Sequence, residues 1–148
     1  GDLDYIHSVD RISRLSNVIS INGGVQLDLM GQENAESAGT RQLSGIGGQM
    51  DFMEGAFRSK GGKGFICINS SRVTKEGERK SNILPAIPAG STVSAPRTII
   101  QYVATEYVVG SLPGKSLRER AEAMASIAHP DFREELLRYA REMLCLYK

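Results

Sequence analysis

The sequence holds few of the residues that build metal centres, disulfide frameworks or membrane spans. Its 148 residues include two cysteines, Cys67 and Cys145, and two histidines, and none of them falls in a metal-ligand spacing. No apolar run approaches the roughly 20 residues that a transmembrane helix needs, and no signal peptide is recognisable. These absences predict a cytoplasmic protein without a metal and without a membrane partner.

An excess of charge of one sign is also missing. The chain has 18 Lys and Arg residues against 17 Asp and Glu residues, so the formal net charge is +1, and the two signs are interleaved. Nucleic acids and acidic membranes attract basic surfaces, so neither is an expected partner. The chain also lacks the GxSxG motif that carries the nucleophile of α/β-hydrolases.

The remaining composition is that of an ordinary globular domain, 41% apolar and 24% charged. A chain of this size buries roughly 68–70% of the surface that it exposes when unfolded. We therefore expect one domain over residues 1–148. Because the chain opens on Gly1 rather than on an initiator methionine, we expect this domain to be a fragment of a longer protein.

Strand patterns fill the first two thirds of the chain and are interrupted by helical ones. Residues 17–22 and 25–29 read as two strands, and Gly23-Gly24 between them favours a hairpin. The continuous apolar run at 64–69 is typical of a strand covered on both faces, with Cys67 packed as a small hydrophobe. Shorter patterns predict a helix at 9–16, a charged turn at 70–79 and strands at 81–87, 92–94 and 99–104.

The last third of the chain is helical by pattern. Ser116 and Glu119 form a capping box, in which each side chain satisfies a free amide of the other residue. His129-Pro130 separates this helix from a second one, because proline suits the first turn of a helix and ends the preceding one. Strands interleaved with helices predict an α/β fold in which a C-terminal helical pair covers a sheet.

The glycine-rich stretch from Ser44 to Lys63 carries the strongest local indication of a binding site. Gly45, Gly47 and Gly48 stand immediately before a helical pattern. Such a turn leaves several backbone amides pointing the same way with no side chains in front of them, as an anion receptor requires. A sharp strand-to-helix corner would use the same residues, and the pattern alone leaves both interpretations open.

Five ordered segments resemble one known family. They are SINGGVQLDLMGQENAES at 20–37, SGIGGQMDF at 44–52, TEY at 105–107, GKSLRERAEA at 114–123 and IAHPDFREEL at 127–136. In this order they are similar to the C-terminal domain of the acetyl-CoA hydrolase/transferase family, which includes 4-hydroxybutyrate, butyryl and acetate CoA-transferases. The TEYG of that family reads TEYV here, with Val108 in place of the glycine.

The resemblance implies a CoA-transferase-like α/β/α sandwich, of which this chain would form the C-terminal half. Members of the family move coenzyme A from an acyl-CoA to a free carboxylate through a glutamyl-CoA thioester, so CoA would be a substrate and no metal is expected. The nucleophilic glutamate would lie N-terminal to this chain, on the half of the enzyme that becomes its partner. A homo-oligomer that acts in acetate metabolism is the corresponding expectation.

By the same resemblance, Gly47 and Gly48 would face the thioester or the CoA arm and donate to an oxyanion, so Gly48→Val should abolish activity without changing the melting temperature. The other implied substrate or CoA contacts are Gly45, Gln49, Asn22, Lys75, Lys60 and Lys63. Lys60 and Lys63 could hold the phosphates of CoA, but lysines beside a surface loop are usually solvated, and that interpretation is favoured for both. Glu106 is interpreted as a residue with a structural hydrogen bond.

Two alternatives to the transferase stay open. An acyl-CoA hydrolase could use the same scaffold, with water in place of the accepting carboxylate. A non-catalytic domain that only binds CoA or docks to a partner would also fit. Loss of the acyl-CoA thioester in the absence of an accepting carboxylate would indicate the hydrolase. A protein that shows neither CoA transfer nor hydrolysis would indicate the binding domain.

Overall fold

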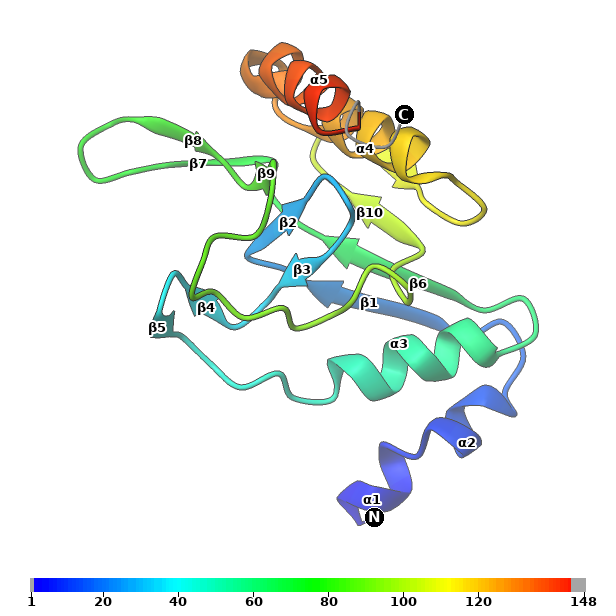
Figure 1. The fold of residues 1–148 in the computed structure, drawn as a ribbon. Coiled ribbons are helices and arrows are strands. Elements are labelled where there is room, and N and C mark those ends of the chain that lie inside the picture. The colour runs from blue at the N-terminus through cyan, green and yellow to red at the C-terminus, as the bar shows by residue number, and fades with distance from the viewer. Residues whose placement is uncertain (1, 145–148) are drawn as a thin grey trace.

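The computed structural model describes residues 2–144 and has an α/β fold, as predicted, built on a four-stranded sheet (Figure 1). The strands follow the order β1-β6-β10-β11; the first three run parallel, and β11 is antiparallel to β10. Their bounds are Ile19–Gly23 for β1, Lys63–Cys67 for β6, Tyr102–Ala104 for β10 and Val109–Ser111 for β11. The parallel strands therefore end at one common edge.

One face of this sheet is buried beneath helices. Pairing places Ile66, Val103 and Gly110 in one row, and all three are buried. Helix α3 (Gln49–Arg58) buries Met53 and Ala56 against this side. Helix α4 (Leu117–Ile127) packs over β11, where a Cβ at Gly110 would lie 3.1 Å from Ile127. The hydrophobic core lies between these helices and the sheet.

The opposite face of the sheet is open in the described chain. Ile19, Ile21 and Val109 are 51%, 67% and 52% exposed, and Phe65 stacks on Tyr102 with ring centroids 4.9 Å apart. The prediction that strand 64–69 is covered on both faces is wrong, because burial along β6 alternates. Cys67 is exposed rather than packed as a small hydrophobe, since it follows Phe65 on the open side.

Smaller sheets extend the fold beside the main one (Figure 1). One has the order β3-β2-β9, and two hairpins pair β4 with β5 and β7 with β8. Their bounds are Gln26–Asp28 for β2, Glu33–Asn34 for β3, Ser37–Ala38 for β4, Arg41–Gln42 for β5, Ser71–Val73 for β7, Arg79–Ser81 for β8 and Ile83–Leu84 for β9. The β7–β8 hairpin projects from the body of the molecule.

Two of the strand predictions need correction. Gly23-Gly24 does not close a hairpin, because β1 and β2 belong to different sheets and the amide of Gly24 donates to Cys67 O at 3.2 Å. This bond prolongs the pairing of β1 with β6. Residues 92–94 form no strand, although Ala95 makes an isolated bridge with Glu33. The turn predicted at 70–79 contains the β7–β8 hairpin.

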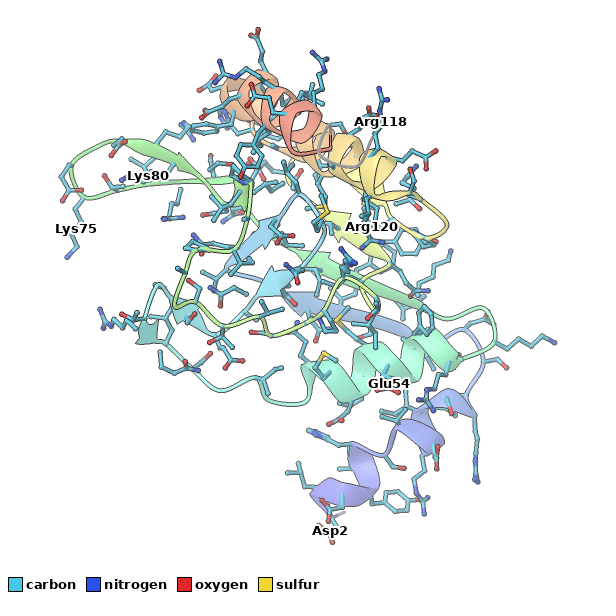
Figure 2. The ribbon with its side chains drawn as sticks, in the orientation of Figure 1. Asp2, Glu54, Lys75, Lys80, Arg118 and Arg120 are labelled. Carbon is cyan, nitrogen blue, oxygen red and sulfur yellow. The ribbon has the colours of Figure 1, made fainter. Side chains whose placement is uncertain are left out.

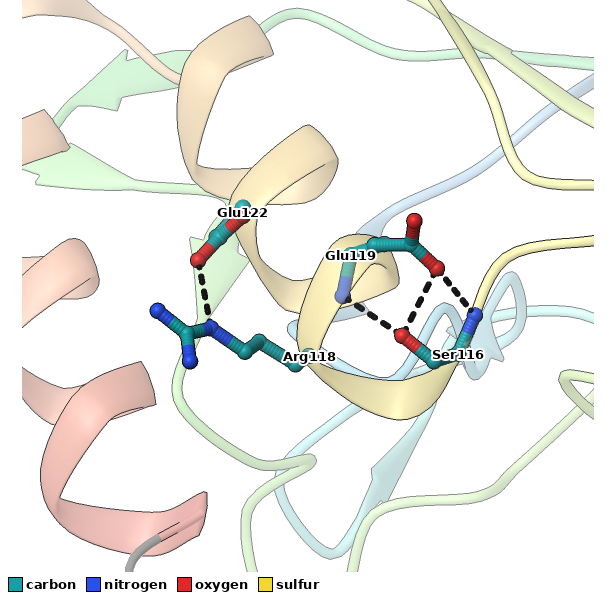
Figure 3. A network of polar contacts seen from close by, with 4 residues as sticks. All are labelled: Ser116, Arg118, Glu119 and Glu122. Carbon is teal, nitrogen blue, oxygen red and sulfur yellow. Dashed lines mark hydrogen bonds and ion pairs between the residues drawn. The ribbon is translucent and has the colours of Figure 1, made fainter.

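The helices agree with the sequence more closely. Helices α1 (Leu3–Ile6) and α2 (Val9–Ser13) are short, and α2 ends three residues before the predicted bound. The C-terminal pair is confirmed, with α5 spanning Pro130–Leu144. Figure 3 shows the confirmed capping box of α4, in which Ser116 N donates to Glu119 at 2.7 Å. Cys145 lies outside the described residues.

Candidate functional site

The candidate site lies at the edge of the sheet where the parallel strands end. In Figure 1 the arrowheads of β1, β6 and β10 and the start of α3 lie toward the same side. Ligands of open α/β sheets bind outside the carboxyl ends of the strands. A cavity of about 420 Å³, here called the strand-end pocket, is found at this edge. Its lining residues are Gly24, Cys67, Ile68, Asn69, Ala104, Thr105 and Glu106.

Glu106 contributes a fixed carboxylate to the strand-end pocket. It accepts hydrogen bonds from the amide of Ser70 at 2.8 Å and from the Ser70 hydroxyl at 2.6 Å. Partial burial alone would raise the pKa of Glu106, but the side-chain and backbone hydrogen bonds from Ser70 outweigh it and hold the pKa below its usual value. The group is therefore ionised at neutral pH.

The structural hydrogen bond expected of Glu106 is confirmed by its contacts with Ser70. Its position in the pocket also gives it access to a ligand. One signal was available, because Glu106 follows the strand predicted at 99–104 and so stands at a carboxyl end. Ser70, which lies 36 residues earlier, could not be paired with it from local patterns.

The glycine turn, residues Gly45–Gly48, leads into α3 at the same edge. Gly45 and Gly47 are exposed, and Gly47 adopts φ 59°, a conformation that glycine tolerates best. Among the described residues, none of the amides from Gly45 to Gly48 donates a hydrogen bond to a protein acceptor. Unused amides at the start of a helix are suited to bind an anion.

Gly48 differs from the other glycines of the turn because a side chain covers it. A Cβ at Gly48 would lie 2.5 Å from His7 Cε1, and His7 Nδ1 lies 3.4 Å from Asp51 Oδ2. Valine at this position would displace the His7 side chain, and the expectation that Gly48→Val leaves the melting temperature unchanged stays a prediction. Gly45 and Gly47 have nothing within 4 Å of their Cβ positions, although φ at Gly47 strains any other residue there.

Two predicted polar neighbours of the turn use their side-chain amides in hydrogen bonds within the protein. Gln49 is 8% exposed, and its Nε2 donates to Glu33 in the interior. Asn22 is half-buried, and its Nδ2 donates to Ser20 Oγ at 2.9 Å along the same strand. Gln49 thus belongs to the support of the glycine turn rather than to its exposed surface.

The three predicted lysines are not brought to the glycine turn. Lys60 follows the last turn of α3 and Lys63 begins β6, so both lie about 15 Å away along a helix of 10 residues, at the opposite edge. Lys75 lies in the turn between β7 and β8, and Figure 2 shows its side chain at the far end of that hairpin. All three therefore lie apart from the amides of the turn.

Within residues 2–144, no group of three or more His, Cys, Asp or Glu side chains is arranged to hold a metal ion. No helix in this range is both long and apolar enough to cross a bilayer.

Comparison with known proteins identifies the family. Residues 1–140 match the acetyl-CoA hydrolase/transferase C-terminal domain. The chain belongs to this family. It is 45% identical over 140 residues to butyryl-CoA:acetate CoA-transferase of Anaerostipes caccae, which is 95% of this chain and 31% of the relative. It is 47% identical over 135 residues to 4-hydroxybutyrate coenzyme A transferase of Clostridium kluyveri, with 91% and 31% covered.

Solved structures agree with the assigned fold. RipA from Yersinia pestis superposes with a TM-score of 0.83 at 40% identity, over 95% of this chain and 31% of that protein. The 4-hydroxybutyrate CoA-transferase of Porphyromonas gingivalis gives a TM-score of 0.74 at 39% identity, over 95% and 30%. A more distant relative, the acetyl-CoA hydrolase of Saccharomyces cerevisiae, is 30% identical over 94% of this chain and 27% of its own length. The chain therefore spans about a third of the length of its curated relatives.

Proposed function

We propose that this chain is the C-terminal domain of a CoA-transferase, which moves CoA between a short-chain acyl-CoA and a carboxylate such as acetate or 4-hydroxybutyrate. The observation that carries the proposal is the glycine turn, with its unused amides at the carboxyl edge of the sheet. Membership of the family and the names of the two relatives with 45% and 47% identity support this class of reaction.

The proposed chemistry gives the amides of the glycine turn a specific task. Each acyl transfer between sulfur and oxygen passes through a tetrahedral species with negative charge developing on oxygen. A fixed donor to such an oxygen contributes about 2.7–4 kcal/mol in enzymes where one was removed. The amides of Gly45, Gly47 and Gly48 would supply these donors. The attacking carboxylate would belong to a glutamate outside this chain, which would carry CoA as a glutamyl thioester.

Glu106 would add a fixed acceptor beside this centre. Because the hydrogen bonds from Ser70 keep its carboxylate ionised, it can accept an N–H group but would repel a phosphate or a substrate carboxylate. The pantetheine arm of CoA carries amide N–H groups that match such an acceptor. We therefore assign Glu106 a role in orienting the arm of CoA, with the phosphates held elsewhere.

The rest of the polypeptide would cover the open face of the sheet. Ile19, Ile21 and Val109 expose apolar side chains there, around the stacked pair Phe65 and Tyr102. Contiguous apolar surface of this kind marks a contact with another part of a protein. The relatives are about three times longer than this chain, which supports an N-terminal half as the occupant.

Label exchange in the full-length protein tests the proposed reaction. Exchange of isotope between acetate and an acyl-CoA is the result expected of a transferase. The hydrolase is the second candidate, favoured by the similarity to the yeast acetyl-CoA hydrolase, and would consume the thioester without any acceptor. A protein that binds CoA but supports neither reaction would be a binding domain, which would contradict the proposal.

A further inference from the structure

Glu33 on β3 has a carboxyl group that no feature of the proposed reaction uses. The residue is 0% exposed, and its Oε1 atom has no hydrogen-bond partner among the described residues. The other well-buried carboxylate nearby, Asp28, is satisfied, because it accepts bonds from Met30 N and from both nitrogens of Gln32. Burying a carboxyl group without full pairing costs stability, so the position of Glu33 calls for an explanation.

The surroundings of Glu33 connect the two parts of the candidate site. Its Oε2 atom accepts a hydrogen bond from Gln49 Nε2, and Gln49 is the first residue of α3. Its Oε1 atom lies 2.8 Å from where a Cβ of Gly24 would stand, and Gly24 lines the strand-end pocket. The backbone amide of Glu33 donates a hydrogen bond to Ala95 O at 3.0 Å, and this bond fixes the backbone of Glu33.

The glycine turn has few other attachments. Upstream, the amides of Leu43 and Ser44 both donate to Glu36 O, at 2.7 and 3.2 Å. None of the backbone amides from Gly45 to Gly48 donates a hydrogen bond to a described residue. At the downstream end of the turn, the carbonyl of Gly48 accepts from Phe52 N within α3, and the bond from Gln49 to Glu33 ties the start of this helix to β3.

We propose that Glu33 is a positioning residue, which holds Gln49 and thereby fixes where α3 begins and how the amides of Gly45–Gly48 point. This role rests on the proposed function, since it matters only if those amides meet an anion. A backbone donor works when it is already aimed at the place where charge develops. Glu33 would act through Gln49 and would not touch the substrate.

The proposal separates function from stability, because a purely structural role predicts a different outcome. Replacing both partners of a buried polar pair by apolar side chains of similar volume is often neutral or stabilising, whereas replacing one leaves the other unpaired at a cost in stability. If Glu33 only fills space, Glu33→Met should leave turnover intact. If Glu33 orients the turn, the double variant Glu33→Met/Gln49→Met, which removes both polar groups, should keep or raise the melting temperature and still lose turnover.

The experiment uses the full-length protein with the variants Glu33→Met, Gln49→Met and Glu33→Gln. Either methionine variant should lower kcat by about tenfold to hundredfold, the effect of a small misplacement, with KM for acyl-CoA little changed. Glu33→Gln keeps an oxygen that can accept from Gln49 and should retain activity close to wild type. The double variant Glu33→Met/Gln49→Met should lose no more than either single one, because both remove the same bond.

Amide hydrogen exchange over residues 43–53 gives a second readout, independent of activity. It should accelerate in Glu33→Met and in Gln49→Met but not in the matched control Glu54→Met, which changes a half-buried carboxylate of the same helix that pairs with Arg58. A Glu33→Met enzyme with wild-type kcat, additive losses in the double variant or unchanged exchange would each overturn the proposal. If the wild type lacks transferase activity, the proposed function fails, and exchange still decides whether Glu33 holds the turn.

Discussion

The carboxylate of Glu106 accepts two hydrogen bonds from Ser70, one from its amide at 2.8 Å and one from its hydroxyl at 2.6 Å. Ser70 follows β6, and Glu106 follows β10, so this pair joins the ends of two neighbouring parallel strands. The bonds fix an ionised group at the strand-end pocket. They also make the charge state of that group open to test.

The variant Ser70→Ala should shift the pH dependence of the full-length enzyme. Loss of the hydroxyl donor lets the pKa of Glu106 rise toward its usual value, so the acid limb of the kcat/KM profile should move to higher pH. Ser71→Ala is the control, because Ser71 Oγ accepts from Arg79 on the projecting hairpin. An acid limb that stays in place in Ser70→Ala would remove Glu106 from the mechanism.

The buried carboxyl group of Glu33 should make stability depend on pH. Burial raises the pKa of Glu33 from 4.5 to about 7, and the hydrogen bond from Gln49 opposes this only in part. Below pH 4.5 both folded and unfolded states hold the proton. As pH rises toward 7 only the folded state keeps it, so stability is lost across this window, by roughly 3 kcal/mol at one pKa unit per 1.36 kcal/mol.

Urea unfolding of the wild type and of Glu33→Gln at pH 5 and pH 8 measures this effect. The glutamine variant cannot titrate at this position, so it should gain stability relative to wild type at the higher pH. Glu54→Gln changes a half-buried carboxylate on α3 that pairs with Arg58, and its difference in stability from wild type should be the same at both pH values. If the stability of Glu33→Gln relative to wild type is also the same at pH 5 and pH 8, Glu33 has an ordinary pKa in the folded protein.

The adjacent residues Gly23 and Gly24 provide a matched pair for the packing around Glu33. Gly24→Ala should destabilise the protein by about 1–3 kcal/mol, typical of overpacking, because its Cβ would lie 2.8 Å from Glu33 Oε1 and 3.2 Å from Ile66. Gly23→Ala meets nothing within 4 Å and should stay within about 0.5 kcal/mol of wild type. Equal effects in the two unfolding curves would contradict the placement of Glu33 beneath Gly24.

The open face of the sheet can be tested with a charge. In the full-length protein, Ile21→Glu should lower stability by several kcal/mol, because a carboxylate would be buried against the N-terminal half. Val73→Glu is the control, since Val73 is 57% exposed on the projecting hairpin. If Ile21→Glu melts like the wild type, the face is exposed to solvent in the full-length protein and has no such partner.

Features that depend on residues close together in the sequence were predictable, whereas features that depend on residues far apart in the sequence were not. The capping box of Ser116 and Glu119 spans three residues and was predicted correctly. The hairpin at Gly23-Gly24 was predicted wrongly, because the amide of Gly24 instead pairs with Cys67, 43 positions later. Local turn chemistry could not reveal a competing strand so far along the chain.

The candidate site shows the same division. The glycine turn was visible as a local pattern, and the structure shows its amides unused. The sequence pattern predicted no element at Glu33, which is buried by long-range contacts that include Ala95 and Gln49. The sequence also offered Lys60 and Lys63 as CoA contacts, but the length of α3 carries them to the other edge.

The amides of the glycine turn are the centre of this account, and one variant tests them without a steric clash. Gly45→Val places a branched side chain where nothing lies within 4 Å, so the melting temperature should not change while the amides become covered. The measurement is isotope exchange between acetate and acyl-CoA in the full-length protein. We predict rapid exchange in the wild type and a loss of about 100-fold or more in Gly45→Val, the effect of removing an oxyanion donor. Equal exchange in both proteins would contradict the account.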